Sequence, residues 1–182
     1  AGAFSTTAEK MGGVTSTVNL GLSLIPQNLI IVGLFVICMF VSISMGTSVG
    51  TVAAIAPVGF GFAQATHVPA ALAMATVVGG AMFGDNLSMI SDTTIAAVRT
   101  QKTKMNDKFR VNFKIVLPGA ILTIIILFFL TNGISIDHAK SYDYNLIKVI
   151  PYLLVLILAL VGVNVIIVLI GGTAVSYTHL RA

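Results

Sequence analysis

Charged residues are scarce in this sequence of 182 residues, and their scarcity excludes an ordinary soluble domain. Only 9% of the residues are charged and 57% are hydrophobic, whereas soluble domains carry about 25% charged residues. Cysteine is limited to Cys38, which lies inside an apolar run, so the sequence offers no disulfide framework. The apolar residues come in long runs, and these runs indicate a chain whose solvent is the lipid bilayer.

The basic residues do not indicate a nucleic-acid-binding protein. The formal net charge is +4, which has the sign that nucleic-acid binding requires. However, most of the basic residues lie in one short segment between apolar runs and not on a folded face. We therefore expect no nucleic-acid partner.

Four apolar stretches divide the chain and predict an all-α polytopic membrane protein. Their ranges are 29–63, 69–98, 112–130 and 149–170. The third and fourth are nearly pure in aliphatic and aromatic residues and have the length of one crossing, about 20 residues, so we predict two ordinary spanning helices. The first and second contain runs of Gly, Ser and Thr, so we predict two discontinuous or re-entrant helical segments.

The two ends of the chain do not resemble the four stretches. Residues 1–28 are rich in Gly and Thr, and Thr6 followed by Glu9 has the spacing of a capping box. This spacing predicts a short helix that begins at Thr6 and lies at the membrane interface. Residues 176–182 follow the last apolar run, which stops at Gly171 and Gly172, and no element is predicted there. We expect both ends to be truncations and residues 176–182 to be an artefactual tail.

The loops between the stretches predict the orientation of the chain. The segment 99–114 has Asp107 as its single acid, opposed by six basic residues: Arg99, Lys102, Lys104, Lys108, Arg110 and Lys114. Positively charged loops stay in the cytoplasm. We therefore predict that the loop 99–114 is cytoplasmic, that the loop 133–148 is outside, and that the basic residues serve topology and not binding.

Asp85 and Asp92 are the acids within the apolar stretches. A charge at the centre of a spanning helix costs about 2.5–3.5 kcal/mol on insertion scales, so intramembrane acids are functional by default. If the segment is helical and Arg99 marks the inner surface of the membrane, Asp85 lies about 20 Å deeper in the membrane than Arg99, and Asp92 lies about 10 Å deeper. The alternative is structural, with the acids pairing with Arg99 or capping helix ends.

Oxygen-bearing side chains surround the two acids and predict a cation site. Hard cations prefer oxygen ligands, and transporters supply them where helices are broken near the midplane. One such break follows Gly84, and a second runs over 46–51; each contains a small-xxx-small pair, Gly46/Gly50 and Gly80/Gly84, which permits close backbone approach. We predict that the two breaks meet. The polar residues at the break that follows Gly84 are Asp85, Asn86, Ser88, Ser91, Asp92, Thr93 and Thr94.

The two breaks carry a resemblance to a known family. The segments GTSVGTVAAIAPV (46–58) and GGAMFGDNLSMISDTTIAAVRTQ (79–101) closely resemble the NhaC-type sodium/proton antiporter family. The resemblance extends from Phe4 to Thr173 and implies about one repeat of an inverted-repeat transporter, so that residues 1–175 form a partial transporter domain. It also implies that Thr47, Ser48 and Thr51 belong to a family motif in the first segment, which pairs with the polar motif of the second segment around Asp85 and Asp92.

Two positions depart from the pattern of this family. Val49 stands where many relatives carry Trp, and Met89 stands where many carry Pro. The first difference would alter the pocket wall, and the second would alter the shape of the break that contains Asp85.

We predict that the chain is part of a secondary antiporter and not of an enzyme. The antiporter would lie in the bacterial inner membrane and exchange Na⁺ for H⁺ without a cofactor. Burial penalises the charged form of a carboxylate and a bound Na⁺ reverses that preference, so Asp85 and Asp92 would hold either protons or Na⁺. The amide and hydroxyl groups would be neutral ligands. The partners are then Na⁺, H⁺, the lipid bilayer and the remainder of the transporter chain, and an oligomer is compatible with the sequence.

Two other functions compete with this prediction. A carboxylate transporter, exchanging lactate or malate with Na⁺ or H⁺, resembles the same family, but Arg99 is the one cation expected beside the polar break, which favours inorganic ions. An intramembrane aspartyl protease would resemble a pattern with Tyr-Asp before Gly-x-Gly-Asp. Here Tyr142-Asp143 comes after Gly84-Asp85, so the order is wrong.

Overall fold

The computed structural model describes residues 2–26, 29–66, 68–131, 143–161 and 163–180. The described residues form α-helices and contain no strand, which confirms the predicted all-α class. The helices are α1 (Gly2–Lys10), α2 (Gly13–Leu24), α3 (Ile30–Met45), α4 (Ser48–Thr66), α5 (Ala70–Leu87), α6 (Asp92–Thr100), α7 (Met105–Thr131), α8 (Leu146–Leu160) and α9 (Val165–Leu180).

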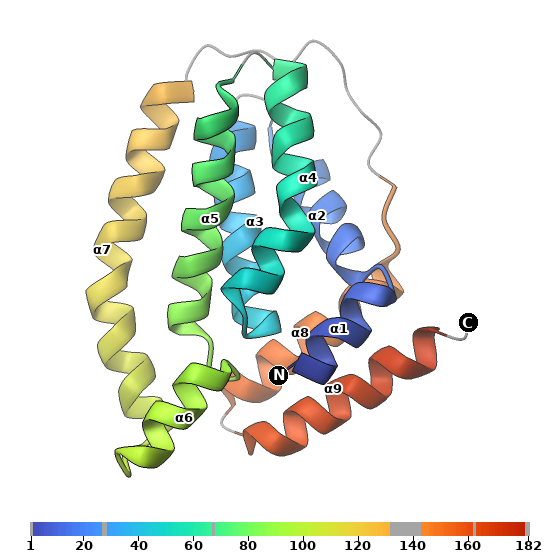
Figure 1. Cartoon of the computed structure of the whole chain (residues 1–182), viewed down its shortest axis with the longest axis vertical. Helices are drawn as coiled ribbons and strands as arrows, with labels where there is room; N and C mark the ends of the chain where they lie inside the picture. Colours follow the sequence, from blue (N-terminus) through green and yellow to red (C-terminus); the bar gives the residue numbers. More distant parts are fainter. Residues whose placement is uncertain (1, 27–28, 67, 132–142, 162, 181–182) are drawn as a thin grey trace.

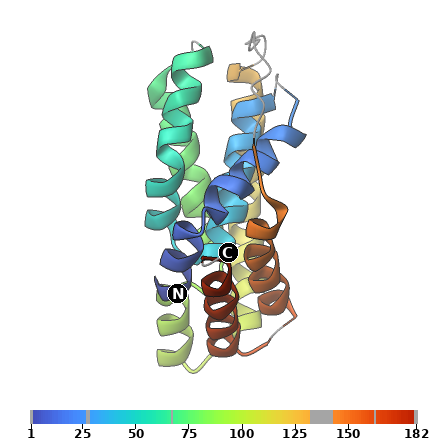
Figure 2. The same cartoon turned by 90° about the vertical axis from the view of Figure 1, so that its right-hand side faces the viewer.

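Helices α3, α4, α5 and α7 run along the long axis of the molecule (Figures 1 and 2). Helices α6, α8 and α9 gather at the lower end in Figure 1, where α1 also lies. By length and composition, two helical stretches of the described residues could cross a membrane: Ala70–Thr100, which includes the connection between α5 and α6, and Met105–Thr131. The apolar side chains of α7 are largely exposed, as a bilayer or further protein would require.

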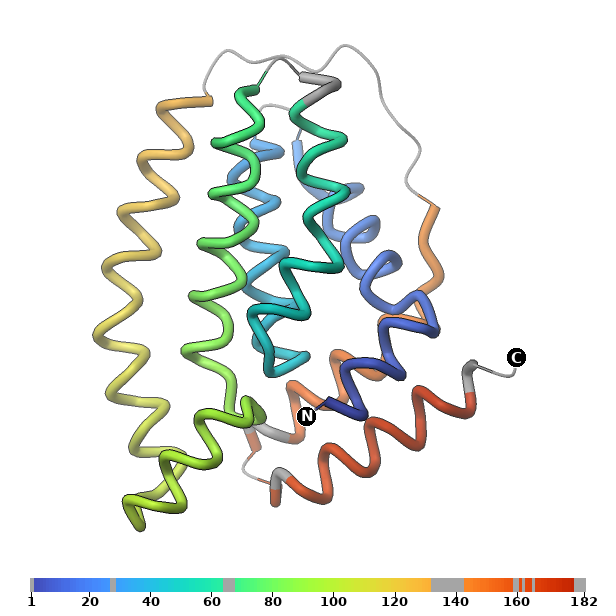
Figure 3. The backbone as a smooth tube through the Cα atoms, in the orientation of Figure 1, coloured from blue at the N-terminus to red at the C-terminus, as the bar shows by residue number. Residues whose placement is uncertain are grey.

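The first apolar stretch is a helical hairpin. Helix α3 ends at Met45 and α4 runs back beside it from Ser48, as the tube in Figure 3 shows. Gly46 allows the reversal because its φ of +71° lies in the left-handed region, and its N–H donates to Ser42 O at 2.9 Å, which caps α3. The predicted interruption over 46–51 is therefore confined to Gly46 and Thr47, since Ser48 already belongs to α4.

Helix α5 packs on α3 through its glycine pair. A Cβ at Gly80 would lie 2.5 Å from Phe35 O, and one at Gly84 would overlap the carbonyl of Met39. Between these two positions Ser42 Oγ donates to Ala81 O at 2.6 Å. The Gly80/Gly84 pair thus mediates close helix packing, and this packing fixes the C-terminal end of α5 against the hairpin turn.

The predicted loop 99–114 is mostly helical. Helix α6 extends to Thr100 and α7 begins at Met105, so the connection spans 101–104. The predicted apolar stretch 112–130 begins later than α7 itself, because the first turns of this helix are polar and include Lys108 and Arg110. Pro118 consequently lies inside α7 and not near its start.

The predicted helix over 149–170 is also wrong, because the chain breaks between α8 and α9. Asn164 Oδ1 accepts the N–H of Ile166 at 2.9 Å and so caps the start of α9. Helix α9 then continues through Gly171 and Gly172 to Leu180, with Ser176 buried. Residues 176–180 therefore extend a packed helix, whereas no element was predicted there.

The predicted start of a helix at Thr6 is wrong. Thr6 lies inside α1, which begins at Gly2. Phe4 and Ala8 of α1 and Val18 of α2 are buried in the core. Phe4 also packs on the ring of Tyr152 in α8, with 5.9 Å between ring centroids. The apolar face of the N-terminal segment is thus covered by protein.

Candidate functional site

Asp85 lies in the last turn of α5, facing the start of α4. Ser48 Oγ donates to Asp85 Oδ2 at 2.9 Å. The other carboxylate oxygen, Oδ1, is buried and has no hydrogen-bond partner among the described residues. A buried oxygen without a partner is costly, so this atom is a candidate ligand for a cation or a candidate proton acceptor.

A pocket of about 270 Å³ opens beside this carboxylate. Residues from α4, α5, α6 and α7 line it, and most of them offer oxygen or nitrogen atoms. They are Ser48, Met82, Asp85, Asn86, Thr93, Thr94, Ala97, Lys108 and Asn112. Of the site residues predicted from sequence, the pocket therefore brings together Ser48, Asp85, Asn86, Thr93 and Thr94.

Two residues of α7 belong to the site although the sequence does not predict them there. Lys108 was expected only to set the membrane orientation, and Asn112 was not among the predicted site residues. Lys108 Nζ donates to Asn86 O at 2.7 Å and to Thr94 Oγ1 at 2.9 Å. Asn112 Nδ2 donates to the same Asn86 carbonyl at 3.0 Å. The signal in the sequence was the spacing of four residues between Lys108 and Asn112, which places both on one face of a helix.

The two polar breaks are in contact, but the predicted break from Gly84 to Asp92 is narrower than expected, because α5 continues through Asp85 to Leu87 and α6 begins at Asp92. Ser88, which follows α5, donates its Oγ to Ile43 O in α3 at 2.8 Å. Gly46 faces the backbone of Ile90, where an added Cβ would lie 3.0 Å from the carbonyl oxygen. The hairpin turn of α3 and α4 and the connection between α5 and α6 therefore pack directly on one another.

The other predicted ligands have local partners. Ser91 and Thr93 share a hydrogen bond of 3.0 Å between their hydroxyl oxygens. Thr47 Oγ1 accepts the N–H of Gly50 at 3.3 Å, and Thr51 Oγ1 donates to Thr47 O at 2.8 Å, so both serve the start of α4. Together with Ser88, the residues Ser91, Thr47 and Thr51 are absent from the pocket lining.

Asp92 occupies a different position from Asp85. It is exposed in the first turn of α6 and does not line the pocket. A negative charge there interacts favourably with the N-terminus of the helix. The sequence pattern groups Asp85 and Asp92 in one site. In the structure the connection that follows α5 separates them, and of these two acids only Asp85 faces the pocket.

Comparison with known proteins decides the family. The sequence model of the Na⁺/H⁺ antiporter family matches residues 1–132. The chain belongs to this family. No solved structure is detectably similar to it.

Curated relatives of this Na⁺/H⁺ antiporter family member include proteins with two different names. The chain is 31% identical over 160 residues to the Na⁺/H⁺ antiporter NhaC of Bacillus subtilis (strain 168), covering 81% of this chain and 35% of the relative. It is 30% identical over 163 residues to the malate-2H⁺/Na⁺-lactate antiporter of the same organism, covering 81% and 34%. The chain is also 33% identical over 132 residues to NhaC of Alkalihalophilus pseudofirmus, covering 72% and 28%.

The antiporter-family chain spans about a third of the length of these curated relatives. The matched family segment, 1–132, contains every pocket residue of α4, α5, α6 and α7. The candidate site therefore lies within the part of the chain whose family membership is shown.

Proposed function

We propose that the chain contributes the ion-binding part of a transporter that exchanges Na⁺ for H⁺ across a bacterial inner membrane. The observation that supports this proposal is the Asp85 carboxylate, which is held on one side by Ser48 and has a buried oxygen without a partner on the other. Around it lie the neutral oxygens of Thr93, Thr94 and Asn86, the ligand type that hard cations prefer.

The proposed mechanism is competition for one carboxylate. Na⁺ binds Asp85 in its charged form, with Ser48 Oγ and a pocket hydroxyl as neutral ligands. A proton neutralises the same group and lowers its affinity for Na⁺, so that the site holds either ion but not both. If only the loaded forms move between the two sides, exchange follows. Asp92 is proposed to orient α6 through its charge at the helix N-terminus.

The two helix junctions are proposed to lie at membrane depth as discontinuous segments. The pocket residue Ser48 lies just after the end of α3 at Met45, and the pocket residue Asn86 lies just before the end of α5 at Leu87. Helix ends leave backbone groups without intrahelical partners, and inside a membrane such groups are tolerated where they line a cavity. The contact between Ser88 and Ile43 supports a shared position for both junctions.

Replacing Ser48 with Ala should weaken Na⁺ binding more than it slows exchange. The change removes the one hydrogen-bond partner that Asp85 Oδ2 has among the described residues. A hydrogen bond to a charged group contributes about 1.5–3 kcal/mol, so the KM for Na⁺ should rise about tenfold. The measurement is Na⁺-driven proton movement by the full-length protein in vesicles that contain a pH-sensitive dye. Ser44→Ala is the control, because among the described residues Ser44 Oγ bonds within α3, to Phe40 O. An unchanged KM in Ser48→Ala would remove Ser48 from the site.

The membrane topology gives a second test. We propose that the connection 101–104 and the first turn of α7 face the cytoplasm, because basic residues cluster there. A Cys at the exposed Asn106 should react with a membrane-impermeant thiol reagent in inverted vesicles and not in intact cells. The parent protein is the control, since Cys38 is buried. Labelling from outside intact cells would reverse the proposed orientation.

Exchange of carboxylates is the second candidate function, and Lys108 is the observation that favours it. Arg99 is the one cation that the sequence places beside the polar break, and this expectation is wrong because Lys108 lines the pocket. An ammonium group beside the amide of Asn112 could bind a carboxylate. The similarity to the malate-2H⁺/Na⁺-lactate antiporter is compatible with this candidate. The Asp85 carboxylate in the same pocket opposes it, since like charges repel.

A further inference from the structure

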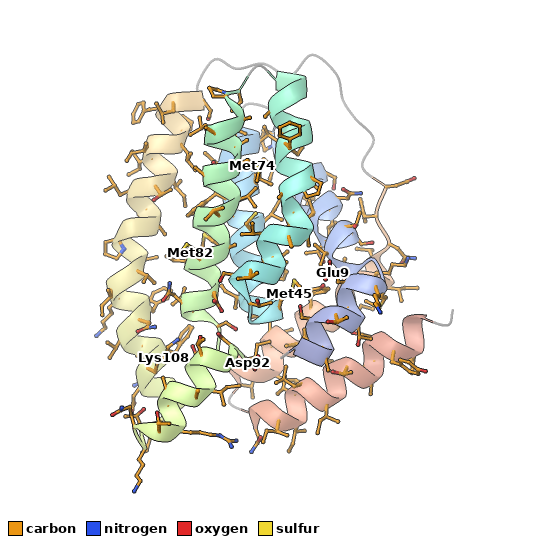
Figure 4. All side chains as sticks on the ribbon, viewed as in Figure 1. Glu9, Met45, Met74, Met82, Asp92 and Lys108 are labelled. Carbon is orange, nitrogen blue, oxygen red and sulfur yellow. The ribbon has the colours of Figure 1, made fainter. Side chains whose placement is uncertain are left out.

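Lys108 makes contacts that connect three helices at the pocket. Its ammonium group bonds the carbonyl of Asn86 in the last turn of α5 and the hydroxyl of Thr94 in the first turn of α6. Figure 4 shows the side chain near the start of α7, beside the lower end of α5. The position is half-buried, so the charge is partly removed from water.

The atoms that Lys108 contacts are of the kind that would bind Na⁺. A backbone carbonyl at a helix C-terminus carries partial negative charge, and a threonine hydroxyl has lone pairs available. Asp85 lies in the same pocket lining, with its Oδ1 atom buried and lacking a partner. The positive charge of Lys108 therefore occupies oxygen atoms that a transported cation could use, next to the carboxylate that would attract such a cation.

We propose that Lys108 is a tethered cation that sets the affinity of the pocket by competing with Na⁺ for its oxygen atoms. The inference rests on the proposed Na⁺/H⁺ exchange at Asp85 and adds to it a residue that determines the affinity for Na⁺. When Na⁺ enters, the ammonium group leaves Asn86 O and Thr94 Oγ1, and it returns when Na⁺ leaves. No proton is gained or lost by Lys108 in this step.

A purely structural role predicts the opposite effect on binding. If Lys108 only joins α5, α6 and α7, removing it loosens the pocket, so Na⁺ affinity falls or exchange is lost. If it competes with Na⁺, removing its charge weakens the competing contact with these oxygen atoms and also removes electrostatic repulsion of the entering ion. The sign of the change in KM therefore separates the two roles.

The test is Lys108→Gln in the full-length protein, reconstituted in dye-containing vesicles. Gln is neutral and can still donate a hydrogen bond to Asn86 O. We expect the KM for Na⁺ to fall on the order of tenfold, as loss of a nearby charge of the same sign implies. Lys108→Arg keeps the charge and should therefore have a KM for Na⁺ above that of Lys108→Gln. Lys114→Gln is the matched control, since Lys114 is exposed on the same helix and lies outside the pocket.

A KM that stays the same or rises in Lys108→Gln would overturn the inference, as would loss of exchange in normally inserted protein. Titration of the purified variants with NaCl in a calorimeter provides a readout that does not depend on exchange. If the parent shows no Na⁺-driven proton movement but Lys108→Gln binds Na⁺ more tightly than the parent, the inference holds and the proposed function fails. Equal Na⁺ affinity in both proteins would reject the inference.

Discussion

Asp85→Asn should abolish Na⁺-driven proton movement by the full-length protein, down to the level of protein-free vesicles. The substitution keeps the size of the side chain and one oxygen but removes the charge and the titratable proton. Competition between Na⁺ and H⁺ requires both, and no second acid lines the described pocket. Membrane insertion should be unaffected or improved, because a charged group at membrane depth is costly. The measurements are dye-reported exchange and the yield of inserted protein.

Asp107→Asn is the matched control for this prediction. Asp107 lies in the first turn of α7, is exposed, and does not line the pocket. Its replacement removes the same charge from the same end of the molecule but should leave exchange near the parental rate. Exchange by Asp85→Asn at the rate of the parent would contradict competition at this carboxylate.

Gly84→Ala should unfold the site by separating α5 from α3. A Cβ at this position would overlap the carbonyl of Met39 and lie 2.7 Å from Ser42 Cβ. Backbone atoms cannot rotate away, so α3 and α5 must move apart; overpacking of this kind costs about 1–3 kcal/mol. This cost exceeds the gain of about 1 kcal/mol that Ala brings to a helix. Because Asp85 is the next residue, we expect both a lower thermal unfolding temperature in detergent and a large loss of exchange.

Gly79→Ala tests whether the effect comes from the contact or from the loss of any glycine in α5. A Cβ at Gly79 would meet only the Phe35 ring, at 3.5 Å, which is an ordinary packing distance. This variant should be as stable as the parent or slightly more stable, because the gain in helix propensity is unopposed. Equal stability of the Gly79→Ala and Gly84→Ala proteins would show that the close crossing of α3 and α5 does not hold the site.

The helical class and the pocket acid Asp85 could be predicted from the sequence, because both depend on local sequence patterns. Long apolar runs indicate membrane helices wherever they occur, and a carboxylate such as Asp85 is costly inside one. The Gly80/Gly84 pair was correctly read as a mark of close packing. The contact between the two breaks was also predicted, since polar groups at depth require partners.

Other features depended on tertiary structure and could not be derived from local patterns. The first apolar stretch could be one interrupted helix or two antiparallel ones, and the left-handed conformation of Gly46 decides for the hairpin. Ser88 has a hydroxyl group that could bind a cation, but this hydroxyl donates a hydrogen bond to Ile43 O. Lys108 was assigned to a loop because basic residues mark topology, whereas the helix that carries it passes beside Asn86.

The most direct test of Na⁺/H⁺ exchange is made with the full-length parent protein in vesicles that enclose a pH-sensitive dye. Addition of NaCl outside should make the lumen alkaline, because entering Na⁺ drives protons out, and choline chloride should have no effect. The same response should appear without malate or lactate on either side. A lumen that stays at constant pH with NaCl alone, and changes only when malate or lactate is supplied, would contradict the account and assign the pocket to carboxylate exchange.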